Sequence, residues 1–387
     1  MRKLLFLFGT RPEAIKLCPI ITYLSGHPET GLQARVAVSA QHRGLLDRVL
    51  DTFSVAPHHD LNVMTPGQTL HQSTSRILAA LEPVLQAERP DLVLVQGDTT
   101  TVLSGALSAF YERIPVAHVE AGLRTGDYDH PFPEEMNRVL AGRLASLHLA
   151  PTEWARRNLL AEGIPDSQIS VTGNSGIDAL LGVAGRLERG DLDSPELIPM
   201  NGSRRLVVVT AHRRENFGAA MENICESLRR LARRPDVQIA FPVHPNPRVR
   251  ETTSRVLSNQ ENIHLLPPLD YVPFVDLMRR AHMLITDSGG VQEEAPSLGK
   301  PVLVLREKTE RPEAVEAGTV ELVGSDAATI ERAAVRLLED SDEYERRTRI
   351  HNPYGDGHAS GRIVAAISAF LSERRAEKVL SSRSTPG

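Results

Sequence analysis

Short apolar runs alternate with longer amphipathic stretches along the whole chain, and this alternation most constrains the fold. The first half has such runs at 3–9, 34–40, 92–98, 115–121, 147–151 and 169–174, and the second at 206–212, 237–244, 263–269, 283–289, 301–306 and 319–324. Apolar strands with helical patterns between them are typical of parallel sheets covered on both faces. The pattern predicts an α/β fold of two doubly wound, Rossmann-like domains with a ligand cleft between them.

The chain has 387 residues, which is too long for one ordinary core. A stretch rich in Pro, Gly, Asp and Ser at 190–205 has no periodicity and separates the two sets of strands. We expect an N-terminal domain over 1–175 and a C-terminal domain over 176–370, with the final helix packing back on the first domain. Residues 371–387 read as a disordered polar tail.

Composition narrows the class of protein. A net charge of −5 gives no broad electrostatic reason to expect nucleic acid or an anionic membrane as partner. The two cysteines, Cys18 and Cys225, are too few for a disulfide framework or a metal cluster, which fits a reducing compartment. The apolar N-terminal stretch is too short for a signal peptide, and no segment is apolar enough to span a membrane. We therefore expect a cytoplasmic protein.

The first strand-to-helix turn, "FGTRPEAIK", carries Arg11, Glu13 and Lys16. A helix beginning near Pro12 offers backbone N–H groups and a positive dipole end, which favour an anion. Arg11 and Lys16 add two cations, whereas Glu13 is expected only to complement the helix dipole. The alternative is that this turn has no function beyond the helix start.

Three carboxylates follow in the first half. Asp98 ends one strand, Glu120 ends the next, and Glu134 starts a helix, so the three are an acid/base candidate set. Asp98 as a helix N-cap, and Glu134 as a helix-dipole residue or an i,i+4 partner of Arg138, are the structural alternatives. Arg138 is also a substrate-binding candidate.

The second half repeats the design. "VVVTAHRRENFG" places His212 and Arg214 after a strand, and a helix-capping cluster is the alternative. "LITDSGGVQEE" places Ser288, Gly289 and Gly290 where the backbone can approach a ligand closely, unless this is an ordinary turn. Glu294, a turn into that helix, can accept ribose hydroxyls, and Arg311 on a polar loop can contact a phosphate.

Several signatures are absent from the sequence. No G-x-G-x-x-G follows a strand, and there is no Walker A sequence, zinc-ligand spacing, H-E-x-x-H or G-x-S-x-G. The sequence gives no support for a bound NAD or a metal, and we expect no cofactor.

Together these blocks resemble the non-hydrolysing UDP-N-acetylglucosamine 2-epimerase family. "FGTRPEAIK", "QHR", "GDTTT", "HVEAGLRTGD", "PFPEEMNR", "TGN", "HRREN", "DSGGVQEEAPSLGKPVLVLR", "ERPEAV" and "NPYGDG" occur in family order over roughly residues 3 to 370. The resemblance implies a GT-B-like fold shared with two-domain glycosyltransferases, UDP and the nucleotide sugars UDP-GlcNAc and UDP-ManNAc as partners, a homodimer, and a place in polysaccharide biosynthesis.

The resemblance also implies residue roles. UDP would be held by Arg11, His212, Ser288, Gly289, Gly290, Glu294 and Arg311, with Leu269 and Phe274 beside the uracil. Lys16, Asp98, Glu120, Glu134 and His212 would line the sugar and the reacting centre. Gln41, His42, Arg214 and His244 match parts of an activating second UDP-GlcNAc site of some relatives, whereas Gly44 and Gly67 depart from it.

Two routes to epimerisation at C2 of the sugar differ in what they require. Oxidation of a neighbouring hydroxyl needs NAD, whereas loss of UDP from C1 acidifies the C2–H and needs carboxylates and cations. The residues favour elimination to 2-acetamidoglucal and re-addition of UDP, with no carboxylate assigned to either face. A glycosyltransferase of the same fold, an idle nucleotide-sugar-binding protein, a hydrolytic enzyme, and an epimerase acting on a related 6-deoxy sugar are the alternatives.

Overall fold

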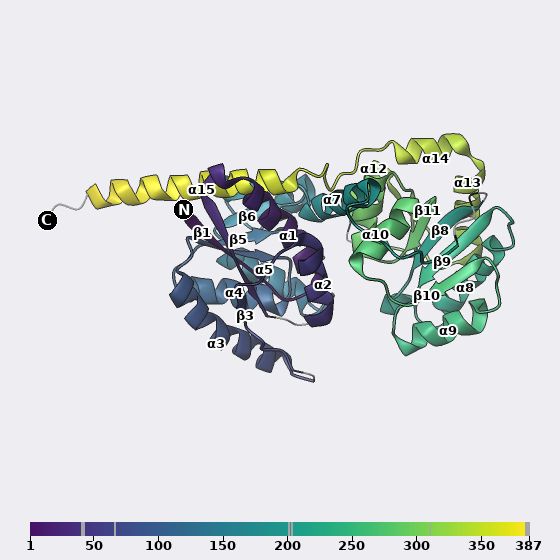
Figure 1. Cartoon of the computed structure of the whole chain (residues 1–387), viewed down its shortest axis with the longest axis horizontal. Coiled ribbons are helices and arrows are strands. Elements are labelled where there is room, and N and C mark those ends of the chain that lie inside the picture. Colours follow the sequence, from purple (N-terminus) through teal and green to yellow (C-terminus); the bar gives the residue numbers. More distant parts are fainter. Residues whose placement is uncertain (40–42, 66, 200–201, 203, 310, 384–387) are drawn as a thin grey trace. The chain divides into compact units, whose positions relative to one another are not determined.

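A computed structural model describes residues 1–39, 43–65, 67–199, 202, 204–309 and 311–383, with backbone alone at 43 and 377–383. The described chain divides into two compact units (Figure 1). Unit 1 contains Met1–Ala179 and the chain from Tyr354 onward, and unit 2 contains Leu180–Pro353. The division falls within helix α7 (Ser175–Arg189), a few residues beyond the expected boundary and before the irregular stretch at 190–205.

Unit 1 is built on a seven-stranded parallel sheet of order β3-β2-β1-β4-β5-β6-β7. Its strands are β1 (Arg2–Phe8), β2 (Leu32–Val38), β3 (His59–Asp60), β4 (Leu92–Gln96), β5 (Val116–Val119), β6 (Leu147–Ala150) and β7 (Ile169–Val171). The sequence predicted six of them and missed β3, because a two-residue strand has no periodicity to detect. The order reverses between β1 and β4, so the carboxyl ends of these strands form a topological switch point.

Helices cover both faces of this sheet. They are α1 (Arg11–Gly26), α2 (Arg43–Phe53), α3 (Leu70–Glu88), α4 (Thr100–Tyr111), α5 (Glu134–Leu144), α6 (Glu153–Ala161), the first part of α7, and α15 (Ala359–Arg383), with short 3-10 turns η1 (Pro28–Thr30) and η2 (Asp166–Gln168). The core beneath them is apolar, as in the cluster of Leu5, Leu7, Ile77 and Val95. Burial of this apolar surface is the main driving force for the unit.

Helix α15 returns the end of the chain to unit 1 and packs along α1 (Figure 1). Backbone N–H groups of Ala359 and Ser360 donate to the carboxylate of Asp178, at 3.1 and 2.7 Å, which anchors its first turn. The helix continues to Arg383, past residue 370 where the sequence analysis began a disordered tail. Residues 384–387 lie outside the described residues.

Unit 2 has a six-stranded parallel sheet of order β10-β9-β8-β11-β12-β13. The strands are β8 (Arg205–Thr210), β9 (Val237–Pro242), β10 (Ile263–Leu266), β11 (Met283–Thr286), β12 (Val302–Val304) and β13 (Val320–Leu322). All six were predicted. The switch point lies between β8 and β11, whose ends are in register at Thr210 and Thr286.

The helices of unit 2 are the rest of α7, α8 (Ala219–Leu231), α9 (Pro247–Leu257), α10 (Tyr271–Arg280), α11 (Gly289–Glu294), α12 (Pro312–Ala317), α13 (Ala327–Glu339) and α14 (Ser341–Thr348), with η3 (Arg214–Asn216) and η4 (Ala295–Leu298). Met221, Phe241, Ile285 and Leu337 belong to one buried core cluster. Helix α11 is short because Pro296 and Gly299 follow it, and the chain tightens into η4.

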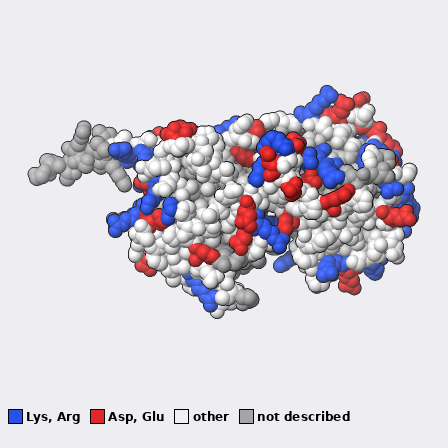
Figure 2. All heavy atoms as spheres, viewed as in Figure 1, with Lys and Arg blue, Asp and Glu red and all other residues white. Residues whose placement is uncertain are grey.

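Acidic and basic side chains are interspersed over the face shown in Figure 2, as the small net charge leads one to expect. Across the described residues, no helix combines the length and the apolar character that a membrane span requires. Cys18 and Cys225 are free and buried, and burial raises the pKa of each thiol to about 12.

Candidate functional site

The β1–α1 turn is organised by Glu13. Thr10 is the N-cap of α1, and Glu13 completes a capping box in which its carboxylate accepts from the backbone N–H groups of Gly9, at 3.0 Å, and Thr10, at 2.7 Å. The second carboxylate oxygen accepts from the hydroxyl of Thr99, at 2.8 Å. Burial is the largest influence on Glu13 and raises its pKa. The expectation that Glu13 serves only the helix dipole was wrong, because it ties the β1–α1 turn to the β4–α4 turn.

Arg11 and Lys16 stand on this first turn and a half of α1. Lys16 forms an ion pair with Glu120 at the end of β5, and both side chains are largely buried. The other carboxylate oxygen of Glu120 accepts from the side-chain amide of Gln96, the last residue of β4. The structure therefore joins Lys16 and Glu120 and adds Gln96, which the sequence analysis did not single out.

Glu120 has a backbone φ of 64°, in the left-handed region that residues with a side chain seldom adopt. Such a conformation costs on the order of 1–3 kcal/mol and persists only where the surroundings impose it. Gly97 precedes Asp98 with a φ of 79°, and a side chain on it would lie 3.6 Å from the Glu120 carboxylate. The left-handed backbone of Glu120 is thus found where its carboxylate is held by both Lys16 and Gln96.

Asp98 accepts from the guanidinium of Arg138, and its backbone carbonyl accepts from Asn137, at 2.9 Å. Thr99, not Asp98, is the N-cap of α4, so the N-cap alternative for Asp98 was wrong. Arg138 also donates to Glu135, at 3.1 Å, and therefore pairs with Asp98 and Glu135 instead of Glu134.

Glu135 is fully buried, and its other oxygen accepts from the N–H groups of Thr125 and Gly126, each at 3.0 Å. Glu134, the first residue of α5, is partly exposed, and its carboxylate has no hydrogen-bond or ion-pair partner among the described residues. Of the three candidate acids, Asp98 and Glu120 are in ion pairs, and Glu134 is in none among the described residues.

In unit 2, His212 is held by a buried carboxylate that the sequence analysis did not identify. Asp287 follows β11 and accepts from the N–H groups of His212 and Arg213, each at 2.8 Å, and from the side chain of Asn216, at 2.9 Å. The imidazole Nδ1 of His212 lies 3.2 Å from the remaining oxygen, at ion-pair distance but without hydrogen-bond alignment.

Burial opposes ionisation of Asp287, but the contacts with His212 and the neighbouring N–H donors outweigh it and lower the pKa of Asp287. A carboxylate beside Nδ1 favours the tautomer with its proton on Nδ1, which leaves Nε2 to face a ligand. His212 is about one-third exposed and is thus accessible.

The residues matched to a second nucleotide-sugar site are only partly placed. Gln41 and His42 lie outside the described residues. Arg214, the first residue of η3, is exposed. The ring of His244 stacks on that of His212, with centroids 5.3 Å apart, and its pKa is lowered by burial and by the neighbouring imidazole.

Ser288, Gly289 and Gly290 form the N-terminus of α11, with Ser288 at the N-cap. Arg311 lies directly against Gly289, because a Cβ on Gly289 would come within 2.4 Å of the guanidinium carbon. Glu293, buried in the same helix, accepts from Nε of Arg311 at 2.5 Å. The glycine therefore serves the close approach of Arg311 to the helix start, and Glu293 fixes its orientation.

The loop that carries Arg311 is tied to α11 as well. Thr309 donates to the side chain of Gln292, at 2.9 Å, and accepts from the backbone N–H of Arg311, at 3.2 Å. Arg311 is thus fixed at both its backbone and its side chain, a preorganised cation beside a helix N-terminus.

Glu294, Leu269 and Phe274 are partly exposed in unit 2. Phe274 is in the first turn of α10, and Leu269 immediately precedes this helix's N-cap, Asp270. Tyr271 is buried, and burial together with the charge of Glu294 raises its pKa well above the ordinary value.

Within the described ranges, no group of three or more His, Cys, Asp or Glu side chains is arranged to hold a metal ion. Each unit presents its polar side chains at the carboxyl edge of a parallel sheet, at the switch point in strand order. The fold and these two edges define an α/β protein of two Rossmann-like units, the class to which GT-B-like proteins belong.

Comparison with known proteins identifies the family. A family model described as UDP-N-acetylglucosamine 2-epimerase matches residues 25–368. A probable UDP-N-acetylglucosamine 2-epimerase of Ralstonia solanacearum is 55% identical over 96% of this chain and 100% of its own length. The UDP-N-acetylglucosamine 2-epimerase of Salmonella typhimurium is 53% identical over 95% of this chain and 99% of its own.

A crystal structure of UDP-GlcNAc 2-epimerase from Neisseria meningitidis bound to UDP-GlcNAc is 46% identical, with a TM-score of 0.87 over 94% of this chain and 99% of that one. The chain belongs to the UDP-N-acetylglucosamine 2-epimerase family.

Proposed function

We propose that this enzyme interconverts UDP-GlcNAc and UDP-ManNAc by eliminating and re-adding UDP. The observation that carries the mechanism is the set of acids at the carboxyl edge of unit 1, where Asp98 and Glu120 are each paired with a cation and Glu134 is not. Family membership supports the substrate, since relatives of this length and identity are named for it.

In the first step the C1–O bond breaks, and its electron pair leaves with the diphosphate of UDP. Positive charge on the sugar ring acidifies C2–H, a carboxylate removes that proton, and a C1=C2 double bond forms to give 2-acetamidoglucal. In the second step a proton is delivered to C2 from the opposite face while a diphosphate oxygen attacks C1. Each positioned acid or base of this kind contributes typically about 10²- to 10⁴-fold.

Residues of the two units support different parts of this reaction. In unit 2, Arg311, Ser288–Gly290 and His212 are suited to UDP, because a fixed guanidinium and an imidazole stabilise the negative charge that develops on the leaving diphosphate. In unit 1, Lys16, Asp98, Glu120 and Glu134 are suited to the sugar, and Arg11 provides a cation at the helix start.

The experiment is turnover of UDP-GlcNAc in D2O with identification of every product by NMR and mass spectrometry. The proposed route places one solvent deuteron at C2 of UDP-ManNAc and also exchanges C2 of recovered substrate. UDP-ManNAc without deuterium at C2 would exclude the elimination. Free ManNAc with UDP would indicate a hydrolase, and UDP release only with an added acceptor would indicate a glycosyltransferase.

Two variants test whether Glu134 takes part in the reaction. Glu134→Gln removes the unpaired acid without disturbing a described contact, so we expect lost turnover with retained UDP binding. Glu153→Gln is the control, since Glu153 also lies in the first turn of a helix of unit 1, although it pairs with Arg156, and is not among the candidate acids.

We also propose that the protein is a homodimer and works in the cytoplasm. Met136 and Leu140 are exposed one turn apart on α5, an apolar pair suited to burial against a second copy. Light scattering of the wild type and of Leu140→Asp tests the dimer. Two free buried thiols fit a reducing compartment.

A further inference from the structure

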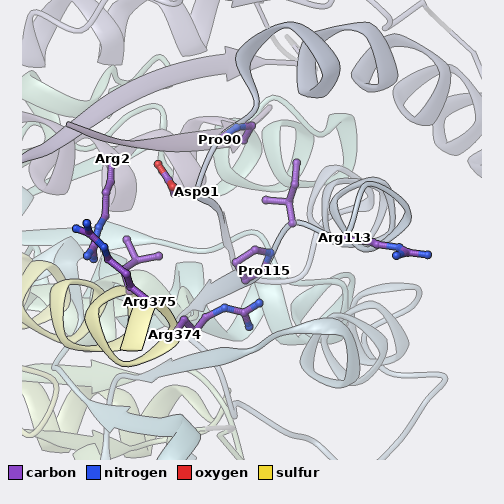
Figure 3. Close-up of a pocket in the computed structure, with 9 residues that line it drawn as sticks. Arg2, Pro90, Asp91, Arg113, Pro115, Arg374 and Arg375 are labelled. Atoms are coloured by element: carbon purple, nitrogen blue, oxygen red, sulfur yellow. The ribbon is translucent and has the colours of Figure 1, made fainter. Parts of the chain in front are cut away.

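A surface pocket of about 290 Å³ lies at the amino-terminal edge of the unit 1 sheet, the edge opposite the candidate acids. Arg2 begins β1, and Asp91 and Arg113 come from the loops that precede β4 and β5. Arg374 and Arg375 reach the pocket from α15 (Figure 3). In this view Arg2 and Arg375 stand on one side, Arg374 lies below Pro115, and Arg113 turns outward.

Positive charge exceeds negative charge among the described residues that line this pocket, with four arginines and one carboxylate. None of the four arginines forms an ion pair within the described part of the chain, although many arginines elsewhere do, such as Arg35 and Arg347. The one carboxylate of the lining, Asp91, accepts from the backbone N–H of Lys3 at 2.7 Å.

Two of the arginines are partly fixed. The guanidinium of Arg374 lies over the ring of Phe370, 5.6 Å from its centroid, and Arg2 makes a long contact of 3.5 Å with the hydroxyl of Ser372. Both contacts leave guanidinium N–H donors unused, because the ring contact uses none and the hydroxyl accepts one. Clustered guanidinium groups with spare donors match the geometry of a phosphate oxygen pair.

An apolar hollow of about 480 Å³ continues from the arginine pocket and shares with it Arg113, Ile114, Pro115 and Arg374. Its further lining includes Phe110, Tyr111 and Leu144. Phe110 and Tyr111 are 59% and 68% exposed, an unusual degree for adjacent aromatic residues. The combined surface is cationic at one end and apolar at the other.

We propose that this surface binds a phosphate-class anion in the arginine pocket, with an apolar substituent of the same ligand lying on the Phe110–Leu144 hollow. The site is separate from the proposed reaction site, since it lies at the start of the strands whose far ends carry Asp98 and Glu120. The ligand chemistry is that of a phosphate ester with an apolar group, which is found both in free phosphate esters and in lipid headgroups.

The first test is calorimetric titration of inorganic pyrophosphate at low ionic strength, with the nucleotide site filled by saturating UDP. We expect one pyrophosphate per chain in the wild type and at least tenfold weaker binding in the double variant Arg374→Ala/Arg375→Ala. If UDP itself enters the arginine pocket, the wild type binds two UDP per chain and the variant one, which supports the same site.

The matched control is Arg229→Ala/Arg230→Ala. This variant also removes two adjacent helical arginines, but these are paired with Glu226 in unit 2, so pyrophosphate binding should stay as in the wild type. Arg2→Ala is a second route to the same loss if the α15 variant unfolds, and retained UDP binding reports folding. Equal pyrophosphate binding in the wild type and in folded pocket variants, with UDP stoichiometry also unchanged, overturns the proposal.

Two further ligands distinguish the sources. If the ligand is a free phosphate ester, octyl phosphate should bind more tightly than inorganic phosphate. In Tyr111→Ser the two should bind with similar affinity. If the ligand is a lipid headgroup, the protein should sediment with phosphatidylglycerol vesicles but not with phosphatidylcholine vesicles. The arginine variant should sediment with neither. Failure of pyrophosphate, octyl phosphate and vesicles to bind through these arginines overturns the site.

Discussion

The substitution Asp287→Asn tests whether a buried carboxylate positions His212. Asp287 is fully buried and collects three N–H donors on one oxygen, from His212, Arg213 and Asn216, while its other oxygen faces the imidazole Nδ1 at 3.2 Å. Asparagine keeps one acceptor oxygen for those donors but loses the charge. It also turns an amide NH2 toward the imidazole, where an Nδ1 proton would now meet another donor.

The magnitude follows from the contacts. Hydrogen bonds to a charged group contribute about 1.5–3 kcal/mol and neutral ones about 0.5–1.5, so three weakened bonds cost roughly 3 kcal/mol of unfolding free energy. The imidazole contact is an ion-pair contact without hydrogen-bond alignment, so its loss, about 1 kcal/mol, lowers kcat/KM by roughly fivefold. Because the pKa of Asp287 is lowered in the folded state, this stabilisation is complete at neutral pH and is lost as pH falls below about 4.

The assay is UDP-GlcNAc turnover by NMR across pH 5–9, with UDP affinity by calorimetry and stability by urea unfolding at pH 7. We expect kcat to fall and UDP to bind still. Asp236→Asn is the control, since this carboxylate of unit 2 is ion-paired at the opposite edge of the sheet. A folded Asp287→Asn enzyme with unchanged kcat would refute the positioning role.

Three other changes have defined outcomes. Lys16→Met leaves the Glu120 carboxylate without its cation, and kcat should fall about 10²-fold or more with little change in UDP affinity; normal turnover would exclude Lys16 from the reacting centre. Gly289→Ala displaces the Arg311 guanidinium, so UDP affinity measured by calorimetry should weaken at least tenfold, and an unchanged Kd would mean that this arginine does not hold UDP. The pKa of Glu88 is lowered to about 2, mainly by hydrogen bonds from Arg35. Ionised Glu88 should therefore contribute about 3 kcal/mol to the free energy of unfolding at pH 7. In urea unfolding at pH 7, Glu88→Gln should be less stable than the wild type by that amount. This difference in unfolding free energy should stay constant above pH 4.5 and disappear as the pH falls from 4.5 to about 2.

The strands and their polar ends were predictable because they depend on local patterns. Apolar β-branched runs gave every strand except β3, and the parallel fold then placed Asp98, Glu120 and His212 at strand ends without further information. Helix capping was less predictable, since Asp98 and Thr99 are both good N-caps and only the geometry shows that Thr99 takes the role. The extent of α15 was missed because its polar sequence gives no amphipathic signal.

Most contacts beneath the site could not be predicted, because their partners are far apart in sequence. Glu293 meets Arg311 from another segment, and Asp287 meets the His212 turn across two adjacent strands. The sequence shows two adjacent acids at 293 and 294, and no pattern tells which one is buried against the arginine. An acid between a strand and a glycine-rich turn, as in "LITDSGG", is the one sequence signal that could have pointed to Asp287.

Three turns that carry candidate site residues are each fixed by a buried carboxylate. Glu13 binds the turn after β1 and reaches Thr99, Glu135 binds the loop at 125–126, and Asp287 binds the turn after β8. Burying an acid is costly unless N–H donors surround it, so each turn and its acid stabilise one another on folding, without substrate. The charged groups at the carboxyl edge of each sheet are thus held in position before a ligand binds. Stabilising charge in a transition state requires such preorganised groups. If Glu134 reacts as proposed, substitutions should separate it from the acids that build the turns. Losses at Glu13, Glu135 or Asp287 should then appear in stability as well as in turnover, and loss of Glu134 in turnover alone.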